Sequence, residues 1–198
     1  RSVTIRLRAG SRHGSNRAPV THRTHAPHPF YMKAYQLINA ISPELQKEIV
    51  SHMFTQHKAA FRMVQGQLAQ ARKLRPVFLQ QKSREEQFNW MLDQLRVKPH
   101  DTVAEQVIQL WLLKGQQPML TAFLDAVGIE HKDGEVEDLP EEITEEKAKA
   151  GIDALLKDHS AEKVALYLTM FQKQKEGGWP GITAAMEAKP ELKLGVAE

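Results

Sequence analysis

Histidines at helical spacing are the residues of this sequence whose chemistry comes closest to that of a catalytic or metal-binding site. Glu48 and His52 are four residues apart and share one face of a predicted helix. A carboxylate beside an imidazole can transfer protons or coordinate a metal ion. His57, five residues further on, lies about 140° round that helix from His52. We therefore predict that these histidines are solvated or partly buried helix side chains.

A second pair, His100 and His159, stands at equivalent places, each just before a predicted helix. The pair could bind a metal ion or respond to pH, but histidine near a helix N-terminus is equally a turn residue, which is the interpretation we favour. The chain has no cysteine, no Glu-x-x-His pair of the diiron kind, no His-Glu-x-x-His zinc motif and no glycine-rich phosphate loop. The sequence therefore predicts no catalytic residue, no cofactor and no metal site.

Residues 1–31 form an Arg- and His-rich tail that we expect to be disordered, because it has little apolar periodicity. The tail holds six arginines, no lysine, no acid and four of the nine histidines. It could bind nucleic acid through phosphate contacts, act as an organellar transit peptide, or bind metal. It also changes character abruptly at Met32. We favour a fourth interpretation, in which the tail is upstream sequence or a cloning remnant and not part of the mature protein.

The body that follows is mildly acidic, because without the tail the chain has 21 basic and 24 acidic residues. Nine of these acids lie between Glu130 and Glu146, against Lys132 alone. Such a run could dock a basic partner or divalent cations, although the residues around Asp133 and Gly134 do not fit an EF-hand loop. A solvated linker is the interpretation we favour, since charge runs usually remain hydrated.

The sequence contains start and stop signals for the helices that would position these side chains. From His100 to Ile129 the sequence predicts a helical hairpin, with a capping box formed by Thr102 and Glu105, a helix end at Gly115, a new start at Pro118 and an end at Gly128. Ser83 and Thr144 are further predicted helix starts. Trp179, beside two glycines, either packs over a turn or marks a ligand-contacting loop, and packing is the expectation we prefer.

Upstream, Ser42 and Pro43 predict the start of a helix that runs without a break to about Lys73, where Arg75 and Pro76 end it. At about 1.5 Å per residue this helix would be about 45 Å long, so it could pack across the rest of the chain as a spine. Downstream, the pattern of residues 83–128 recurs at 144–188, which predicts two three-helix units that stack on each other.

Together these patterns predict an all-α protein, a helical bundle or short helical-repeat array, with one helical domain over residues 32–198. No apolar run approaches the roughly 20 residues that span a bilayer, and the lack of cysteine suits a reducing compartment, so we expect a cytoplasmic protein without membrane contact. The preferred function is a non-enzymatic protein-interaction or scaffold module with an unidentified protein partner. The alternatives are nucleic-acid binding through residues 1–31 and an enzyme using His52, His57, His100 or His159. The oligomeric state is left open.

Overall fold

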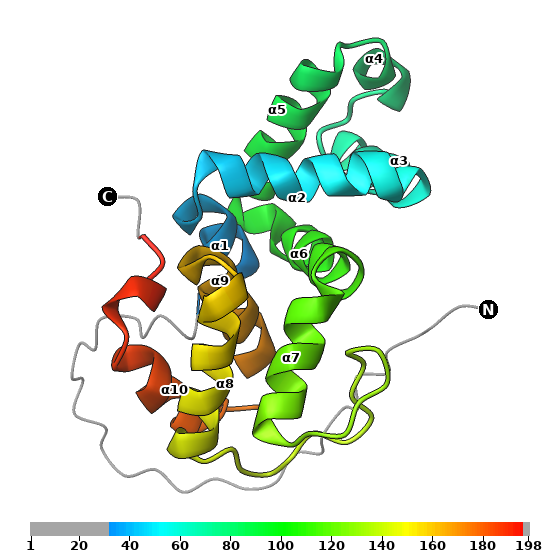
Figure 1. Cartoon of the computed structure of the whole chain (residues 1–198). Coiled ribbons are helices and arrows are strands. Elements are labelled where there is room, and N and C mark those ends of the chain that lie inside the picture. The colour runs from blue at the N-terminus through cyan, green and yellow to red at the C-terminus, as the bar shows by residue number, and fades with distance from the viewer. Residues whose placement is uncertain (1–31, 196–198) are drawn as a thin grey trace, which may run out of the picture.

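The computed structural model describes residues 32–195, so the predicted disordered tail over residues 1–31 lies outside the described residues. Within the described range the chain is helical, with no strand beyond an isolated bridge between Lys132 and Glu135. The all-α prediction is confirmed. The helices are α1 (Ala34–Ala40), α2 (Pro43–Gln56), α3 (Lys58–Ala71), α4 (Pro76–Gln80), α5 (Arg84–Leu95), α6 (Asp101–Gly115), α7 (Gln117–Val127), α8 (Glu145–Asp158), α9 (Ala161–Gln172) and α10 (Pro180–Glu187), with 3-10 turns at Lys98–His100 and Pro190–Leu192 (Figure 1).

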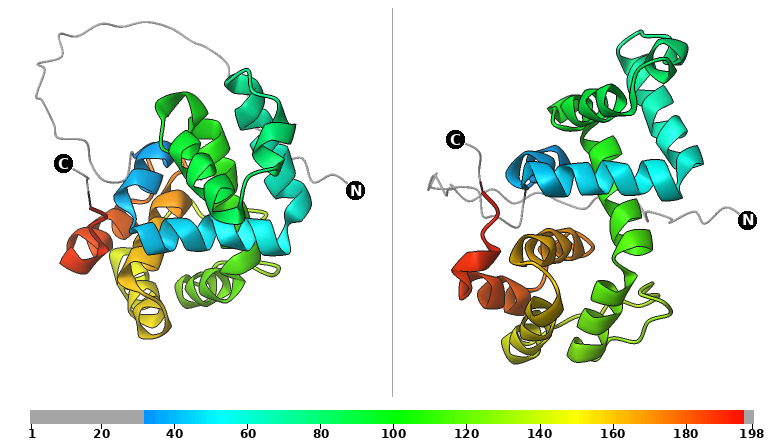
Figure 2. Two further views of the ribbon diagram at one scale, coloured as in Figure 1. Left: turned by 90° about the horizontal axis from the view of Figure 1, so that it is seen from above. Right: turned by 45° about the horizontal axis from the view of Figure 1, so that its top comes forward.

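The helices form a packed body from which three of them project. In the body, α6 contacts α1 and α2, α7 packs along α8, and α8 packs along α10. Helices α3, α4 and α5 extend away from the body at one end, and the right-hand view in Figure 2 shows the same projection. The extensive contacts of α3 are with α2, α4 and α5, so α3 reaches the rest of the molecule mainly through α2.

Large aromatic side chains fill the core of the body. Trp111, Phe123 and Trp179 are fully buried. The Trp179 ring stacks on Phe171, with 4.8 Å between ring centroids, and its indole N–H donates to the carbonyl oxygen of Pro140 at 2.9 Å. The prediction that Trp179 packs over the turn is confirmed, because its ring stacks on a residue of the core and its N–H bonds to the backbone of the same chain.

The predicted continuous helix from residue 42 to about residue 73 is wrong, because the chain turns sharply at His57 (φ −132°, ψ 55°) between α2 and α3. The break brings the rings of Phe54 and Phe61 within 5.0 Å of each other, and Phe88 lies 5.3 Å from Phe54. Seven residues of straight helix would separate Phe54 and Phe61 by about 10.5 Å. Aromatic burial between α2, α3 and α5 therefore accompanies the break.

Most of the predicted helix starts are confirmed. Ser42, Ser83 and Thr144 each accept a hydrogen bond from a backbone N–H in the first turn of the following helix. The capping box at Thr102 and Glu105 is wrong, since α6 begins at Asp101, with His100 as its N-cap, two residues earlier than predicted. Three features account for the difference. The 3-10 turn leads directly into α6, the Asp101 carboxylate accepts from the backbone N–H of Tyr35 at 3.2 Å, and Glu105 pairs with Lys173.

Each of the two predicted units, residues 83–128 and 144–188, contains three helices. Gly128 ends α7 in the left-handed conformation (φ 75°), as predicted. The triplets differ in arrangement, because α8 packs along α10 whereas α5 lies far from α7 (Figure 1). The relation between them stays a prediction. No helix within residues 32–195 is long and apolar enough to cross a bilayer.

Candidate interaction surface

The break at His57 changes the position of the His57 ring relative to that of His52. In the structure the rings of His52 and His57 lie 5.3 Å apart, so the predicted divergence of about 140° is wrong. Burial lowers the pKa of His52, and the neighbouring His57 lowers this pKa further, against the opposing effect of Glu48. The Glu48 carboxylate is held by Lys163 at 2.7 Å. His52 is partly buried, as predicted.

The other two histidines take structural positions. His100 is buried, and its Nδ1 lies 2.8 Å from the carbonyl oxygen of Gln94, in the turn between α5 and α6. His159 is half-buried at the end of α8. Among residues 32–195, no three His, Cys, Asp or Glu side chains are grouped so that they could hold a metal ion. The geometry thus brings only His52 and His57 together.

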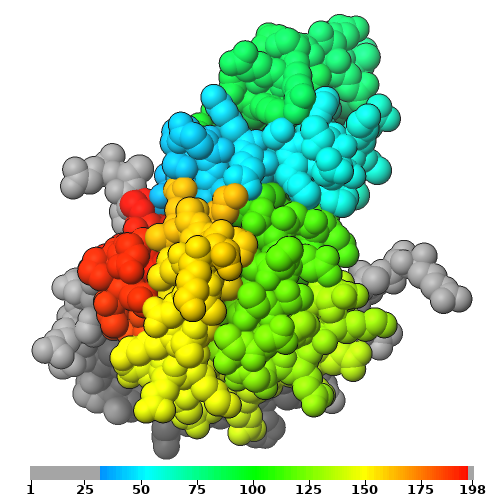
Figure 3. Space-filling model, in the orientation of Figure 1, coloured from blue at the N-terminus to red at the C-terminus, as the bar shows by residue number. Residues whose placement is uncertain are grey.

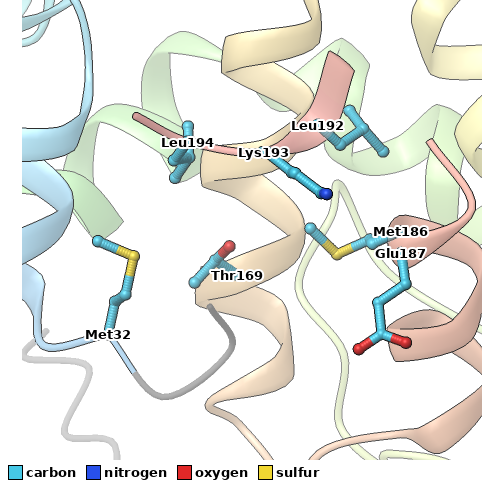
Figure 4. A pocket seen from close by; sticks show the side chains of 7 residues that line it. All are labelled: Met32, Thr169, Met186, Glu187, Leu192, Lys193 and Leu194. Atoms are coloured by element: carbon cyan, nitrogen blue, oxygen red, sulfur yellow. The ribbon is translucent and has the colours of Figure 1, made fainter. Parts of the chain in front are cut away.

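Two pockets of the described chain are also not lined by a group of residues typical of a catalytic site. The smaller has a volume of about 30 Å³, and its lining side chains include Met32, Thr169 and Met186 (Figure 4). This volume is about that of one water molecule. The larger, of about 600 Å³, follows the Gly177–Gly178 turn and borders Met32, the first described residue. The ionisable residues that line it are lysines and glutamates, without a histidine.

A different surface stands out by its exposed apolar side chains. Within residues 32–195, the exposed large hydrophobic residues are five, and four of them lie in residues 63–78, on α3, on α4 and in the turn between these helices. Phe78 is 59% exposed, which is more than any other of the five. Contiguous apolar patches on a folded protein mark contact sites for other molecules more often than scattered single residues do. The four side chains are those of Met63, Leu74, Val77 and Phe78.

The same segment carries a one-sided charge. We name residues 58–84 the basic arm, which comprises α3, α4, the turns beside them and the first residue of α5. The basic arm has seven lysines and arginines and no acid. All seven are exposed, namely Lys58, Arg62, Arg72, Lys73, Arg75, Lys82 and Arg84. Within the described chain, Lys58, Arg62, Lys73 and Arg75 have no ion-pair partner.

Contacts of exposed, partly buried and buried side chains hold the basic arm in a defined shape beneath this surface. The Arg84 guanidinium lies over the rings of Phe54 and Phe88, at 4.9 Å and 5.1 Å from their centroids. Gln65 donates to the side-chain oxygen of Gln87 at 3.2 Å, and Phe61 is buried between α2, α3 and α5. Cation–π and aromatic contacts of this kind fix the relative orientation of helices. The exposed side chains of the basic arm therefore project from an ordered support.

A second charged surface lies on the body, beside α7 and between α7 and α8 (Figure 1). We name residues 130–146 the acidic segment, which joins α7 to α8, and its nine acidic side chains are all exposed. Leu139, in its middle, is the fifth exposed large hydrophobic residue. The backbone on either side is anchored, because the carbonyl oxygen of Pro140 accepts from the Trp179 indole and that of Glu141 accepts from Lys175. Ile143 is buried in the body. The segment is thus an anchored surface loop.

Reasoning from the sequence missed the basic arm, although a signal was present. Residues 49–84 contain no aspartate or glutamate. Exposure of Val77 and Phe78 was not predictable from the pattern, because both lie beyond the predicted helix end at Arg75 and Pro76, where the sequence indicated no further element.

Comparison of the chain with protein families, with curated proteins and with solved structures finds no match.

Proposed function

We propose that the protein is a non-enzymatic protein-interaction module that binds a partner through its basic arm. One observation carries the proposal: in residues 58–84, which have no acid, exposed apolar side chains, with Phe78 the most exposed, stand among seven exposed basic side chains. An apolar centre surrounded by polar and charged groups is the usual composition of a protein interface. The charge favours a partner surface that is acidic and partly apolar.

Two further observations support a binding role over catalysis. The described histidines do not form a group with carboxylates that could hold a metal ion. The neighbouring His52 and His57 rings lie beside Glu48, whose carboxylate is already paired with Lys163. A general base needs access to the proton that it takes, and the buried Nε2 atom of His52 has no partner in the described chain. These features fit side chains that serve packing.

Nucleic acid is a weaker match for the basic arm, although the arm would attract phosphates. Nonspecific nucleic-acid binding relies on basic side chains and on exposed aromatic rings that stack on bases. Phe78 is the one exposed aromatic ring among residues 58–84, whereas Met63, Leu74 and Val77 offer no stacking face. Binding through residues 1–31 remains an alternative on sequence grounds alone.

Capture from native extract tests the proposal. The bait is the full chain, compared with Val77→Ser/Phe78→Ser and with Ala122→Ser/Ala126→Ser, a control at exposed apolar positions of α7 outside the basic arm and the acidic segment. We expect a protein that the native chain and the Ala122→Ser/Ala126→Ser variant retain in equal amount and that Val77→Ser/Phe78→Ser retains in smaller amount. Captured proteins that are identical for all three baits would contradict a role for the basic arm. A turnover activity lost on changing His52 or His57 would contradict the non-enzymatic assignment.

A further inference from the structure

The basic arm and the acidic segment are complementary in two respects. Residues 58–84 carry seven basic side chains and no acid, and residues 130–146 carry nine acids and one lysine. In addition, the five exposed large hydrophobic residues of the described chain are divided between these two surfaces, four on the basic arm and Leu139 on the acidic segment. Opposite charge steers association, and apolar contact stabilises the complex once it has formed.

The two surfaces cannot meet within one folded molecule. The basic arm projects at one end, and the acidic segment runs beside α7 and then below it to α8, so that α6 lies between the segment and the arm (Figures 1 and 3). The acidic segment is also tied down by the Trp179 and Lys175 hydrogen bonds, so it cannot swing across the body. Any contact between the two surfaces has to join different molecules.

We propose that the basic arm binds the acidic segment of a second copy of this chain. The inference rests on the proposed function, because it names the partner of the same surface. In this contact Leu139 of one copy packs against the exposed side chains around Phe78 of the other, and carboxylates such as Glu137 and Asp138 face Arg62 and Arg75.

The anchoring of the acidic segment favours this occupant over a disordered acidic peptide. Pro140 and Glu141 are fixed to the body through their carbonyl oxygens, and Ile143 is buried, so Leu139 is presented on a loop that is already ordered. A partner that is ordered before binding loses less conformational entropy in the complex. Because the two surfaces differ, the contact is head-to-tail, and each copy keeps one arm and one segment available. The association therefore extends to rings or open chains.

Sedimentation velocity of the full chain over a concentration series tests the inference. We expect the mean sedimentation coefficient to rise with concentration at low salt and to fall back as salt is added, since screening weakens exposed charge pairs. The arm variant Arg62→Glu/Arg75→Glu and the segment variant Glu137→Lys/Asp138→Lys should each weaken the association constant by about tenfold or more. The matched control, Lys47→Glu/Lys157→Glu, changes net charge as the arm variant does at exposed positions outside both surfaces, and we expect it to associate like the native chain.

Combining the two charge reversals separates a direct contact from a general charge effect. Mixing the arm variant with the segment variant restores complementary pairs, so the mixture should associate where neither variant does alone. The chain that carries all four substitutions should also associate, because its surfaces are again complementary. Failure of both combinations to associate would overturn the proposal.

Two further outcomes distinguish this inference from the proposed function. A full chain that stays monomeric over the whole concentration series overturns self-association, while a partner in extract that depends on Val77 and Phe78 would leave the proposed function standing. Association that is lost on reversing the acidic segment and unaffected by reversing the basic arm overturns the inference as well, because the segment would then bind another basic region, such as residues 1–31. Arm-dependent capture of nucleic acid would overturn both.

Discussion

Two regions of the molecule differ in how closely their helices pack. One is the contact region of α7, α8 and α10, and the other is the basic arm. A Cβ atom on Gly181 of α10 would stand 2.1 Å from the carbonyl oxygen of Ile143, and one on Gly151 of α8 would stand 2.9 Å from the Phe123 ring. A Cβ atom on Gly66 of α3 would meet nothing within 4 Å. At Gly181 and Gly151 the body has no room for a methyl group, whereas the basic arm has open space beside Gly66. Side chains that packing does not constrain are available for binding.

The largest effect that we predict is that of Gly181→Ala. The new methyl group would overlap the backbone of residues 143–145, which cannot move without dislodging the buried Ile143 and the start of α8. We expect the free energy of unfolding to fall by about 3 kcal/mol, measured by chemical denaturation. A loss below about 1 kcal/mol would show that this contact region is less closely packed than the structure indicates.

Gly151→Ala and Gly66→Ala form a matched pair that compares the packing of the body with that of the basic arm. Both glycines lie inside helices, so alanine favours the helix equally at both sites. At Gly151 the methyl group presses on Phe123 and Val127, and we expect a loss of about 2 kcal/mol in the free energy of unfolding. At Gly66 it has open space, and we expect a gain of about 0.5–1 kcal/mol. Equal effects of the two substitutions would remove the distinction between body and arm.

Tyr167→Phe tests the packing of the body by removing a group instead of adding one. The Tyr167 hydroxyl is buried among the core aromatic rings and has no hydrogen-bond partner within the described residues, and burial raises its pKa. Removing an unpaired buried hydroxyl should leave the free energy of unfolding unchanged or raise it by up to about 1 kcal/mol. Thermal denaturation of the two proteins measures this change. A loss of more than about 1 kcal/mol would mean that the hydroxyl has a partner in solution.

The smallest effect concerns Glu86, at the edge of the basic arm. Hydrogen bonds from the Ser83 hydroxyl and the Ser83 backbone N–H, helped by Lys82, lower its pKa from the usual 4.5 to about 2. Because the folded-state pKa lies below that of the unfolded chain, the interaction stabilises the fold above pH 4.5 and is lost as the pH falls towards 2. An NMR titration of the Glu86 carboxyl should show this low pKa, and Ser83→Ala should raise it. A native pKa near 4.5 would mean that the edge of the arm is not ordered.

Local signals in the sequence predicted the parts of the fold that depend on a few adjacent residues. Ser42 followed by Pro43, and Ser83 followed by Glu86, fix helix starts through bonds that close within one turn, and both predictions are confirmed. Gly128 likewise ends α7 because its own backbone conformation requires it. These features need no knowledge of the rest of the chain.

Contacts between distant residues decided the parts that the sequence did not predict. The break at His57 has no glycine or proline to announce it, and it accompanies the packing of Phe61 on Phe54 and Phe88. The start of α6 moved to Asp101, whose carboxylate accepts from Tyr35, 66 residues away in the chain. The candidate surface was missed for the same reason. Its charge is readable from residues 49–84, but exposure of Phe78 depends on where α4 lies.

Photo-cross-linking in living cells tests the central claim, that the basic arm is a binding surface, most directly. A photoreactive phenylalanine analogue replaces Phe78, which is exposed and aromatic, and in a separate chain it replaces Lys47, which is exposed on α2 outside both charged surfaces. We expect a discrete covalent adduct with a protein from position 78 and none from position 47. Peptide mapping then shows whether the partner peptide is residues 130–146 of a second copy. No adduct from position 78, or equal adducts from both positions, would contradict the central claim.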